Sequence, residues 1–369
     1  MTETARSDRR DDRRDGDRSA ARTDGGRPTV AVVACGGTIA SEPSDGGAAP
    51  EKTGADLVEA VPAAADHARV TTREVCSQPG FDVRWGDVLA TADAVRDAVG
   101  EGEVGGDSGG TAEGSGDADG VVVTHGTDTL ADTAFALDLL TDLDAPVVVT
   151  GAQRRLDEPS SDVPANLALA VRAAADDRFA AGVHVAFDDE LHAARDAVKG
   201  HSNALSTMTS PGSGPVATFT RAASRVLRAP ERGVSVEPLT DAIEGPADVP
   251  EVPVIHSGTG VGAGAFERAL DADVGGVVVE GTGLGNVTGA LGDALGEAVE
   301  SVPVVVAGRP PAGPTEPVYG TPGGAVTLAD HGVTFAGDLP AAKARVALAL
   351  GLAADLDRDG IEALFAPPA

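Results

Sequence analysis

Two threonines follow apolar runs at the points where a buried strand is expected to end. Thr38 comes after the run 30–34, and Thr127 comes after the run 120–123. Side chains at the carboxyl ends of parallel strands gather in one crevice of an α/β fold, so we expect the two hydroxyls to share a site. A threonine hydroxyl is a weak nucleophile until a base or a proton relay activates it. The pair therefore predicts nucleophilic chemistry that depends on a third group.

Lysine is the candidate for that group because the chain has almost none. The 28 basic residues include only three lysines, Lys52, Lys199 and Lys343. Arginine stays protonated in proteins, whereas the pKa of lysine shifts readily on burial, so arginine cannot fill a proton-transfer position. Lys199 lies in a polar stretch after the strand-like run 182–187. It is the lysine that we assign to the relay.

Each of these features also fits an ordinary structural role when it stands alone. Gly37 with Thr38 is compatible with a tight turn and a helix cap. Asp128 or Thr129 could cap the helix predicted to follow. Lys199 alone would be a solvated surface charge. Their occurrence together favours a functional site.

The order of the motifs carries a resemblance to a known family. The motifs are residues 36–40, 77–78, 124–129, 147–153, 161–167 and Lys199. In order and spacing they resemble the L-asparaginase family, and the likeness continues through 343–345, from residue 29 to the end of the chain. The resemblance implies an L-asparagine amidohydrolase that releases ammonia and L-aspartate through an acyl-enzyme.

The resemblance also assigns catalytic roles to residues that match the family motifs. Thr38 corresponds to the nucleophile. Thr127, Asp128 and Lys199 correspond to a second catalytic group, in which the lysine assists proton transfer through the threonine hydroxyl and the aspartate helps to bind the substrate amino group. We expect neither a cofactor nor a metal ion.

Three further residues match the family's substrate contacts. Ser77 and Gln78 correspond to residues that bind the substrate carboxylate and amino groups. Asn286, in the glycine-rich segment 281–286, corresponds to a residue that a neighbouring chain contributes. The expected partners are thus the small-molecule substrate, L-asparagine or L-glutamine, and further copies of the chain in a dimer or tetramer.

The chain departs from the family at one position that matters for the nucleophile. The family uses a tyrosine on the mobile loop after the first threonine, and the corresponding residues 41–52 contain none. The only tyrosine is Tyr319, for which we expect a structural role; the alternative is that it approaches the site from another chain. What activates Thr38 therefore stays open.

Two other functions share these motifs. One is a D-type component of the archaeal glutamyl-tRNA(Gln) amidotransferase, because the segments 281–285 and 317–321 resemble that branch of the family. Members of that branch carry a folded domain before the first strand, and residues 1–28 are too few to form one. The other is a non-catalytic amino-acid-binding homologue, suggested by the missing loop tyrosine.

Composition restricts the environment. With 58 acidic and 28 basic residues the formal charge is −30, which disfavours binding to nucleic acid or to an anionic membrane. Scarce lysine, 48 glycines and this acidity suggest a halophile's cytoplasmic protein, because at 1 M salt a Debye length of about 3 Å removes most of the self-repulsion. Residues 1–28 lack the apolar stretch of a secretory signal and are predicted to be a disordered tail.

The elements that must position these residues are of α/β type. Near-continuous apolar runs alternate with alanine-rich helical patterns, as in parallel strands covered on both faces. We predict a larger N-terminal domain with a doubly wound parallel sheet, then a smaller C-terminal α/β domain. The predicted boundaries are 29–220 for the first domain with a flexible insertion at 100–120, 221–251 for a linker and 252–369 for the second domain.

Overall fold

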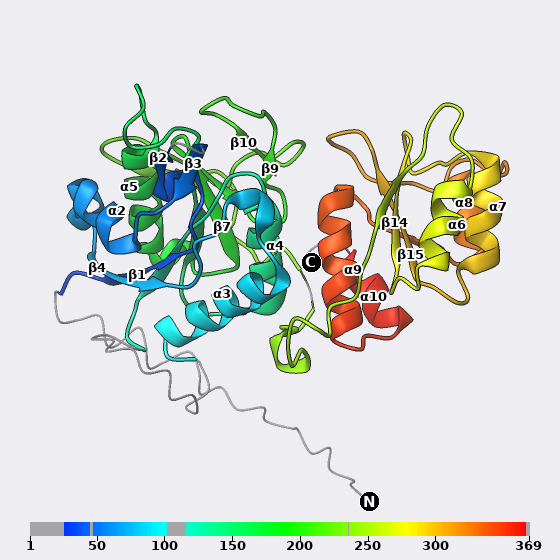
Figure 1. The fold of residues 1–369 in the computed structure, drawn as a ribbon, viewed down its shortest axis with the longest axis horizontal. Helices are drawn as coiled ribbons and strands as arrows, with labels where there is room; N and C mark the ends of the chain where they lie inside the picture. Colours follow the sequence, from blue (N-terminus) through cyan, green and yellow to red (C-terminus); the bar gives the residue numbers. More distant parts are fainter. Residues whose placement is uncertain (1–25, 45–46, 102–115, 235, 367–369) are drawn as a thin grey trace, which may run out of the picture.

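The computed structural model describes residues 26–44, 47–101, 116–234 and 236–366. Most of the predicted tail (1–25) and of the predicted insertion (102–115) lies outside these residues. The chain forms a larger α/β unit from its N-terminal half and a smaller one from its C-terminal part (Figure 1). A large, mainly parallel sheet and a separate small parallel sheet confirm the predicted fold class.

The first sheet has eight strands in the order β12-β11-β8-β7-β6-β5-β1-β4. Five are parallel: β1 (Thr29–Ala34), β4 (Arg69–Glu74), β5 (Gly120–Thr124), β6 (Val147–Thr150) and β7 (Val183–Phe187). Three antiparallel strands extend one edge: β8 (Glu190–Ala193), β11 (Ala217–Phe219) and β12 (Ser224–Val226). The sheet therefore continues past residue 220, where the linker was predicted to begin.

Helices cover both faces of this sheet because its valines alternate between two cores. Val33 points into a core with α3 (Trp85–Ala98) and α4 (Leu130–Leu140). Val32 points into a core with α2 (Gly54–Ala60) and α5 (Val163–Ala174). Thr53 opens α2 with a capping box to Asp56. Short 3-10 helices complete the connections: η2 (Thr38–Ala40), η3 (Pro62–Asp66), η4 (Gly80–Asp82), η5 (Asp177–Phe179) and η6 (Thr240–Ala242).

Strand order creates a switch point beside β1. The chain runs from β1 outward to β4 and then crosses to β5 on the other side of β1. Ligands of open α/β sheets bind outside the carboxyl ends of the strands at such a point. Two small ladders lie outside the main sheet: the hairpin β2 (Ser41–Ser44) with β3 (Gly47–Pro50), and β9 (Val198–Lys199) with β10 (Met208–Thr209).

The second domain is a four-stranded parallel sheet with helices on both faces. Its strands are β13 (Val254–His256), β14 (Val277–Gly281), β15 (Val304–Gly308) and β16 (Thr334–Phe335). One face packs on α6 (Gly264–Asp271), α7 (Gly289–Ala298) and α8 (Ala325–Asp330). The other face packs on α9 (Ala341–Ala353), which α10 (Arg358–Leu364) flanks.

Helix α9 joins the two domains. It packs on β14 and β15 of its own domain and on α4 of the first domain, so one hydrophobic core crosses the seam between them (Figure 1). Within the described parts of the chain, every helix is too short or too polar to cross a membrane. The same parts hold no group of three or more His, Cys, Asp or Glu side chains arranged to bind a metal ion.

Candidate active site

Three loops meet at the switch point, where β1, β4 and β5 end. The Gly37 amide donates to the Gln78 carbonyl at 3.0 Å, which joins the first loop to the second. The Thr129 hydroxyl donates to the Gly80 carbonyl at 2.6 Å, which joins the third loop to the second. The structure thus brings together the loops that carry Thr38, Ser77 with Gln78, and Thr127.

Glycine is required where these loops touch. Gly37 has a positive φ of 82°, and a Cβ built there would lie 2.3 Å from the Cα and N of Gly126. A Cβ at Gly126 would lie 2.5 Å from the Cα of Gly80. Only residues without a side chain allow backbones to approach so closely. These contacts set the Thr38 loop directly against the Thr127 loop.

Lys199 reaches this cluster from outside the main sheet. It lies on β9, opposite Met208 of β10. Its Nζ is 2.9 Å from Thr127 Oγ1 and 2.7 Å from Asp128 Oδ1. An ammonium group only donates, so Thr127 Oγ1 is the acceptor and its own hydrogen stays available for another acceptor. The structure therefore brings together three of the four predicted catalytic residues through direct hydrogen bonds.

Burial differs across this triad. The Thr127 residue is 5% exposed, whereas the Asp128 side chain is 53% exposed and that of Lys199 is 18% exposed. The hydroxyl that accepts from Lys199 is thus held within the protein, while the carboxylate faces solvent. A carboxylate in that position is accessible to a cationic group on a small molecule.

His125 supports the loop that carries Thr127 and Asp128. Its Nδ1 is 2.8 Å from the Gly126 carbonyl, and its Nε2 is 3.1 Å from the Thr133 hydroxyl. A carbonyl only accepts, so Nδ1 carries the proton and Nε2 accepts from Thr133. Burial lowers the pKa of His125, which favours this neutral form. His125 was part of a sequence motif, but its supporting role depends on Thr133, one turn into α4, and that contact was not predicted.

Thr38 lies at the start of η2 and is partly buried. Its hydroxyl makes no hydrogen bond to any other residue that the structure describes. The hairpin that follows is closed by the Lys52 amide, which donates to the Ala40 carbonyl at 2.9 Å, and by an ion pair between Lys52 and Glu42. The nucleophile predicted from the sequence is therefore placed at the crevice without a bonded base.

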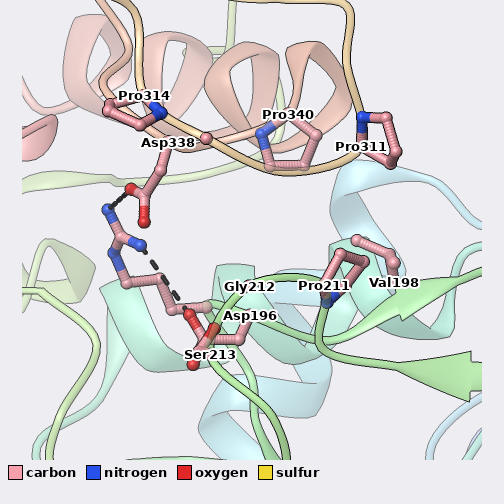
Figure 2. A pocket seen from close by; sticks show the side chains of 11 residues that line it. Asp196, Val198, Pro211, Gly212, Ser213, Pro311, Pro314, Asp338 and Pro340 are labelled. Carbon is pink, nitrogen blue, oxygen red and sulfur yellow. Dashed lines mark hydrogen bonds and ion pairs between the residues drawn. The ribbon is translucent and has the colours of Figure 1, made fainter.

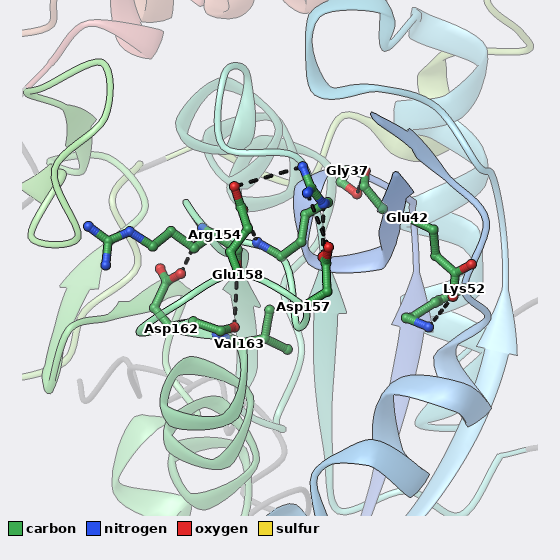
Figure 3. A network of polar contacts seen from close by, with 11 residues as sticks. Gly37, Glu42, Lys52, Arg154, Asp157, Glu158, Asp162 and Val163 are labelled. Atoms are coloured by element: carbon green, nitrogen blue, oxygen red, sulfur yellow. Dashed lines mark hydrogen bonds and ion pairs between the residues drawn. The ribbon is translucent and has the colours of Figure 1, made fainter. Parts of the chain in front are cut away.

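The loop after β6 faces this hairpin. Figure 3 shows Glu42 and Lys52 on one side and Asp157 with Glu158 on the other. The bond with Glu42 raises the pKa of Lys52, and the Asp157 carboxylate adds a smaller effect in the same direction. Asp162 shapes the loop by accepting the Gln153 and Arg154 amides, both at 2.9 Å.

The two predicted substrate-binding residues of the first domain lie between these loops. Ser77 is exposed, and its hydroxyl donates to the Pro50 carbonyl at the end of the hairpin, at 2.9 Å. Gln78 accepts the Gly37 amide through its backbone. Both residues therefore border the loop that carries Thr38.

Asn286 lies in the second domain. Its backbone pairs with Thr282, and its side-chain oxygen accepts the Ala325 amide at the start of α8, at 3.1 Å. Its side-chain nitrogen has no partner among the residues that the structure describes. Between those residues, no hydrogen bond or ion pair joins Asn286 to the first-domain loops. The structure of one chain therefore does not bring Asn286 to the other predicted site residues.

Tyr319 also lies in the second domain, before α8. The residue is 56% exposed, next to Val318 at 55%. At that exposure the residue is not part of a core of this chain, and the structural role expected from the sequence stays a prediction. The phenol is therefore accessible on the surface of the second domain.

Sequence models of two domains cover nearly all of the described residues. The model described as Asparaginase, N-terminal matches residues 29–106 and 111–232, and the model described as Glutaminase/Asparaginase C-terminal domain matches residues 251–365. The chain belongs to the asparaginase family. Family membership confirms the resemblance drawn from the loop motifs and supports a hydrolase acting on small amides.

Individual relatives fall into two groups. The chain is 32% identical to the probable periplasmic L-asparaginase of Haemophilus influenzae and 30% identical to L-asparaginase 2 of Escherichia coli, over 92% of each chain. It is 32% identical to the D component of the glutamyl-tRNA(Gln) amidotransferase of Methanothermobacter thermautotrophicus, over 76% of this chain and 62% of that component. The chain thus spans less than two thirds of the length of that amidotransferase component.

Proposed function

We propose that the protein is an L-asparagine amidohydrolase that releases ammonia and L-aspartate through an acyl-enzyme on Thr38. The observation that carries this proposal is the pair of hydrogen bonds from Lys199 to Thr127 and Asp128. The glycine contacts bring the Thr38 loop to the same crevice. Relatives named L-asparaginase match over 92% of the chain, which supports the same reaction.

The proposed reaction has two steps. Thr38 Oγ1 attacks the carbon of the substrate's side-chain amide, the proton of its hydroxyl passes to the amide nitrogen, and the carbon–nitrogen bond breaks to release ammonia. Water then cleaves the threonine ester, which releases aspartate and restores the hydroxyl. Thr127 can pass on a proton because its own hydrogen is not used by Lys199, and the lysine assists the transfer by exchanging a proton with this hydroxyl, which an arginine could not do.

The remaining predicted residues would bind the two ends of the substrate. Asp128 is exposed enough to accept the substrate's ammonium group, and Ser77 with Gln78 would hold the carboxylate and amino groups. L-Glutamine is the second substrate that this chemistry allows. One methylene is discriminated by about 1–3 kcal/mol of pocket fit, so the two amides differ in rate rather than in mechanism.

We also propose that the active unit is at least a dimer, in which Asn286 completes the site of a neighbouring chain. Its amide nitrogen lacks a partner among the described residues, and it lies apart from the first-domain loops, which supports this arrangement. Closed two-fold pairing is the commonest way to build such a shared site. With a net charge of −30, lowering the salt should increase repulsion between chains and reduce oligomer size together with activity. Light scattering with parallel assays tests this, and a fully active monomer would contradict it.

A D-type amidotransferase component is the second candidate, because proteins of that name are among the relatives. One from Halobacterium salinarum is 33% identical over 76% of this chain and 65% of the relative. A protein of this type would act as one part of a larger enzyme. It would not be expected to release ammonia from free asparagine by itself.

The deciding experiment uses the purified full chain in multimolar KCl, with ammonia measured after addition of free L-asparagine or L-glutamine. Rapid release from asparagine supports the proposal. Calorimetric binding of L-aspartate without release from either amide would favour the amino-acid-binding homologue. Absence of both binding and release would favour the D-type component.

A further inference from the structure

Lys343 is a charged side chain buried in the seam between the two domains. It lies on α9 and is 1% exposed. Its Nζ donates to the backbone carbonyls of Ala194 at 2.6 Å, Arg195 at 2.8 Å and Ala197. An ammonium group has three hydrogens and accepts no hydrogen bond, so the three carbonyls satisfy all of its donors.

These carbonyls belong to the turn that leads to Lys199. The amides of Asp196 and Ala197 both donate to the Ala193 carbonyl at 3.0 Å, which forms the turn after β8. Strand β9 follows at once, and Lys199 is its second residue. The position of this turn therefore determines where the backbone of Lys199 lies relative to Thr127.

Lys343 also contacts the helix that follows the other relay residues. Its Nζ lies 5.6 Å from the centre of the Phe135 ring on α4, and α4 begins at Leu130, directly after the loop with Thr127 and Asp128. One ammonium group thus contacts both the turn that precedes Lys199 and the helix that follows Thr127 and Asp128.

Burial and the neighbouring charges act on Lys343 in opposite directions. Burial lowers the pKa of Lys343 to about 7, while the carboxylates of Asp132, Asp196 and Asp138 oppose that shift and the Arg195 guanidinium adds to it. An ammonium group away from water requires fixed acceptors, and buried carbonyls require donors. Replacing Lys343 by an apolar residue would leave three carbonyls of the turn unpaired.

The outer side of the same turn is held by ion pairs. Figure 2 shows the cleft between the domains, with Asp196 and Val198 on the first-domain side and Asp338 and Pro340 on the second. The largely buried Arg195 crosses this cleft to Asp338 at 2.6 Å, and Asp196 pairs with Arg228. Lys343 differs from these side-chain pairs because it donates to three backbone carbonyls of the turn itself.

We propose that Lys343 is a positioning residue of the relay: it fixes the turn 194–197 against α4 and α9 and so holds Lys199 within hydrogen-bond reach of Thr127 and Asp128. This inference rests on the proposed function. It gives the second domain a role in the active site of its own chain, separate from the role of Asn286 in a neighbouring chain.

The test compares Lys343→Met with Arg345→Met in the full-length protein at high salt. Arg345 lies on the same helix, and its guanidinium is 5.7 Å from the centre of the Trp85 ring on α3. The control therefore removes a cation that contacts the first domain away from the turn. Two quantities are measured: kcat and KM for ammonia release, and hydrogen exchange of the peptide 193–201.

Lys343→Met should lower kcat by about 10- to 100-fold, because a displacement of about 1 Å in a reacting group costs that much. KM should change less than about threefold, since the substrate contacts proposed for Ser77 and Gln78 are untouched. Exchange should rise in residues 193–201 and not throughout both domains. Arg345→Met should change kcat by less than about twofold.

Wild-type kcat in folded Lys343→Met, or an exchange increase equal to that of Arg345→Met, would overturn the proposal. Lys343→Gln provides a second variant should the methionine variant not fold, because its amide keeps donors for two carbonyls and should give an intermediate kcat. A folded Lys343→Gln with wild-type kcat and exchange would also overturn it. The exchange measurement tests whether Lys343 restrains the turn even if the wild type does not hydrolyse asparagine. Failure of the proposed function would instead appear as a wild type that releases no ammonia.

Discussion

The two halves of the proposed site are held in different ways. In the relay half, Lys199 donates hydrogen bonds to both Thr127 and Asp128. His125 bonds the Gly126 carbonyl and the Thr133 hydroxyl, so it ties the loop that carries Thr127 and Asp128 to α4. In the nucleophile half, the Thr38 hydroxyl has no partner within the described residues, and the side-chain contact of the hairpin beyond it is the partly exposed Glu42–Lys52 pair. The chain by itself therefore preorganises the relay and leaves the nucleophile to be completed.

This difference bears on the missing loop tyrosine. Preorganised groups act on a reacting atom without rearranging during the reaction, which is where enzymes gain most of their rate. A nucleophile without a bonded base must obtain one when substrate binds or when a neighbouring chain docks. We expect changes in the relay half to affect mainly kcat, and changes in the hairpin to affect mainly KM.

The largest effect is expected from Thr38→Ala. Without the hydroxyl no ester forms, so turnover should fall by about 10⁴-fold or more. The fold should be retained because Thr38 lies at the start of the short helix η2, is only partly buried and makes no side-chain hydrogen bond to another described residue. Assays of ammonia release, with mass spectrometry of quenched wild-type protein, check this: the wild type should carry an acyl adduct on Thr38. Thr38→Ser is the control and should keep measurable activity. Normal turnover in Thr38→Ala would end the assignment.

Lys199→Arg should have the next largest effect. Arginine keeps the charge but cannot exchange its proton, so kcat should fall by about 10²- to 10⁴-fold. The matched control is Lys52→Arg, which makes the same change in the hairpin and should leave kcat near its wild-type value. Equal kcat values in the two variants would show that Lys199 takes no part in proton transfer and is a surface charge.

A buried histidine in the sheet of the first domain gives a prediction for pH. His184 on β7 is fully buried, neither ring nitrogen has a partner among the described residues, and burial lowers its pKa to about 4. Between about pH 6.5 and 4 this imidazole is protonated in the unfolded chain, where its pKa is about 6.5, and stays neutral in the folded protein. The contribution of His184 to folding stability is therefore complete above about pH 6.5 and is lost as the pH drops toward 4.

This loss should amount to about 3 kcal/mol for His184, and His184→Phe should remove it. Urea unfolding of both proteins at several pH values in constant high salt measures the difference. Parallel curves for variant and wild type between pH 6.5 and 4 would disprove the contribution of His184.

Gly37→Ala should weaken the junction between the two halves. The new Cβ would meet the Gly126 backbone at 2.3 Å in a left-handed conformation, which together cost about 2–3 kcal/mol of unfolding free energy. Gly214→Ala is a control with a similar φ of +71° and nothing within 4 Å of the new Cβ. Chemical unfolding should show the smaller loss for Gly214→Ala; equal losses would mean that strain in φ, not the loop contact, dominates.

The smallest effect is expected from Glu42→Gln in the hairpin. It removes a partly exposed ion pair, so KM for asparagine should rise by less than about threefold with kcat unchanged. Steady-state kinetics checks this. A large fall in kcat would show that the hairpin is part of the chemical machinery and would remove the contrast between the two halves.

The sequence predicted the parallel strands β1, β5, β6 and β7 because their apolar runs are buried, as in β5 and β6. It did not predict the parallel edge strand β4, which is largely exposed and has no apolar run. It did not predict β9, β10 or β12, since strands of two or three residues have no periodicity to detect. Lys199 was selected for its rarity and chemistry, and its bond to Thr127 depends on those short strands. The position of Lys343 in the seam follows from the docking of α9, which no local pattern encodes.

The glycine contacts have a consequence for inheritance. Every amino acid that could replace Gly37, Gly80 or Gly126 adds a Cβ to a space filled by backbone. Selection for a folded protein is therefore enough to retain these glycines, even in a descendant that has lost the reaction. In any relative, the hydroxyls that match Thr38 and Thr127, and the amine that matches Lys199, are the residues by which retained chemistry should be judged.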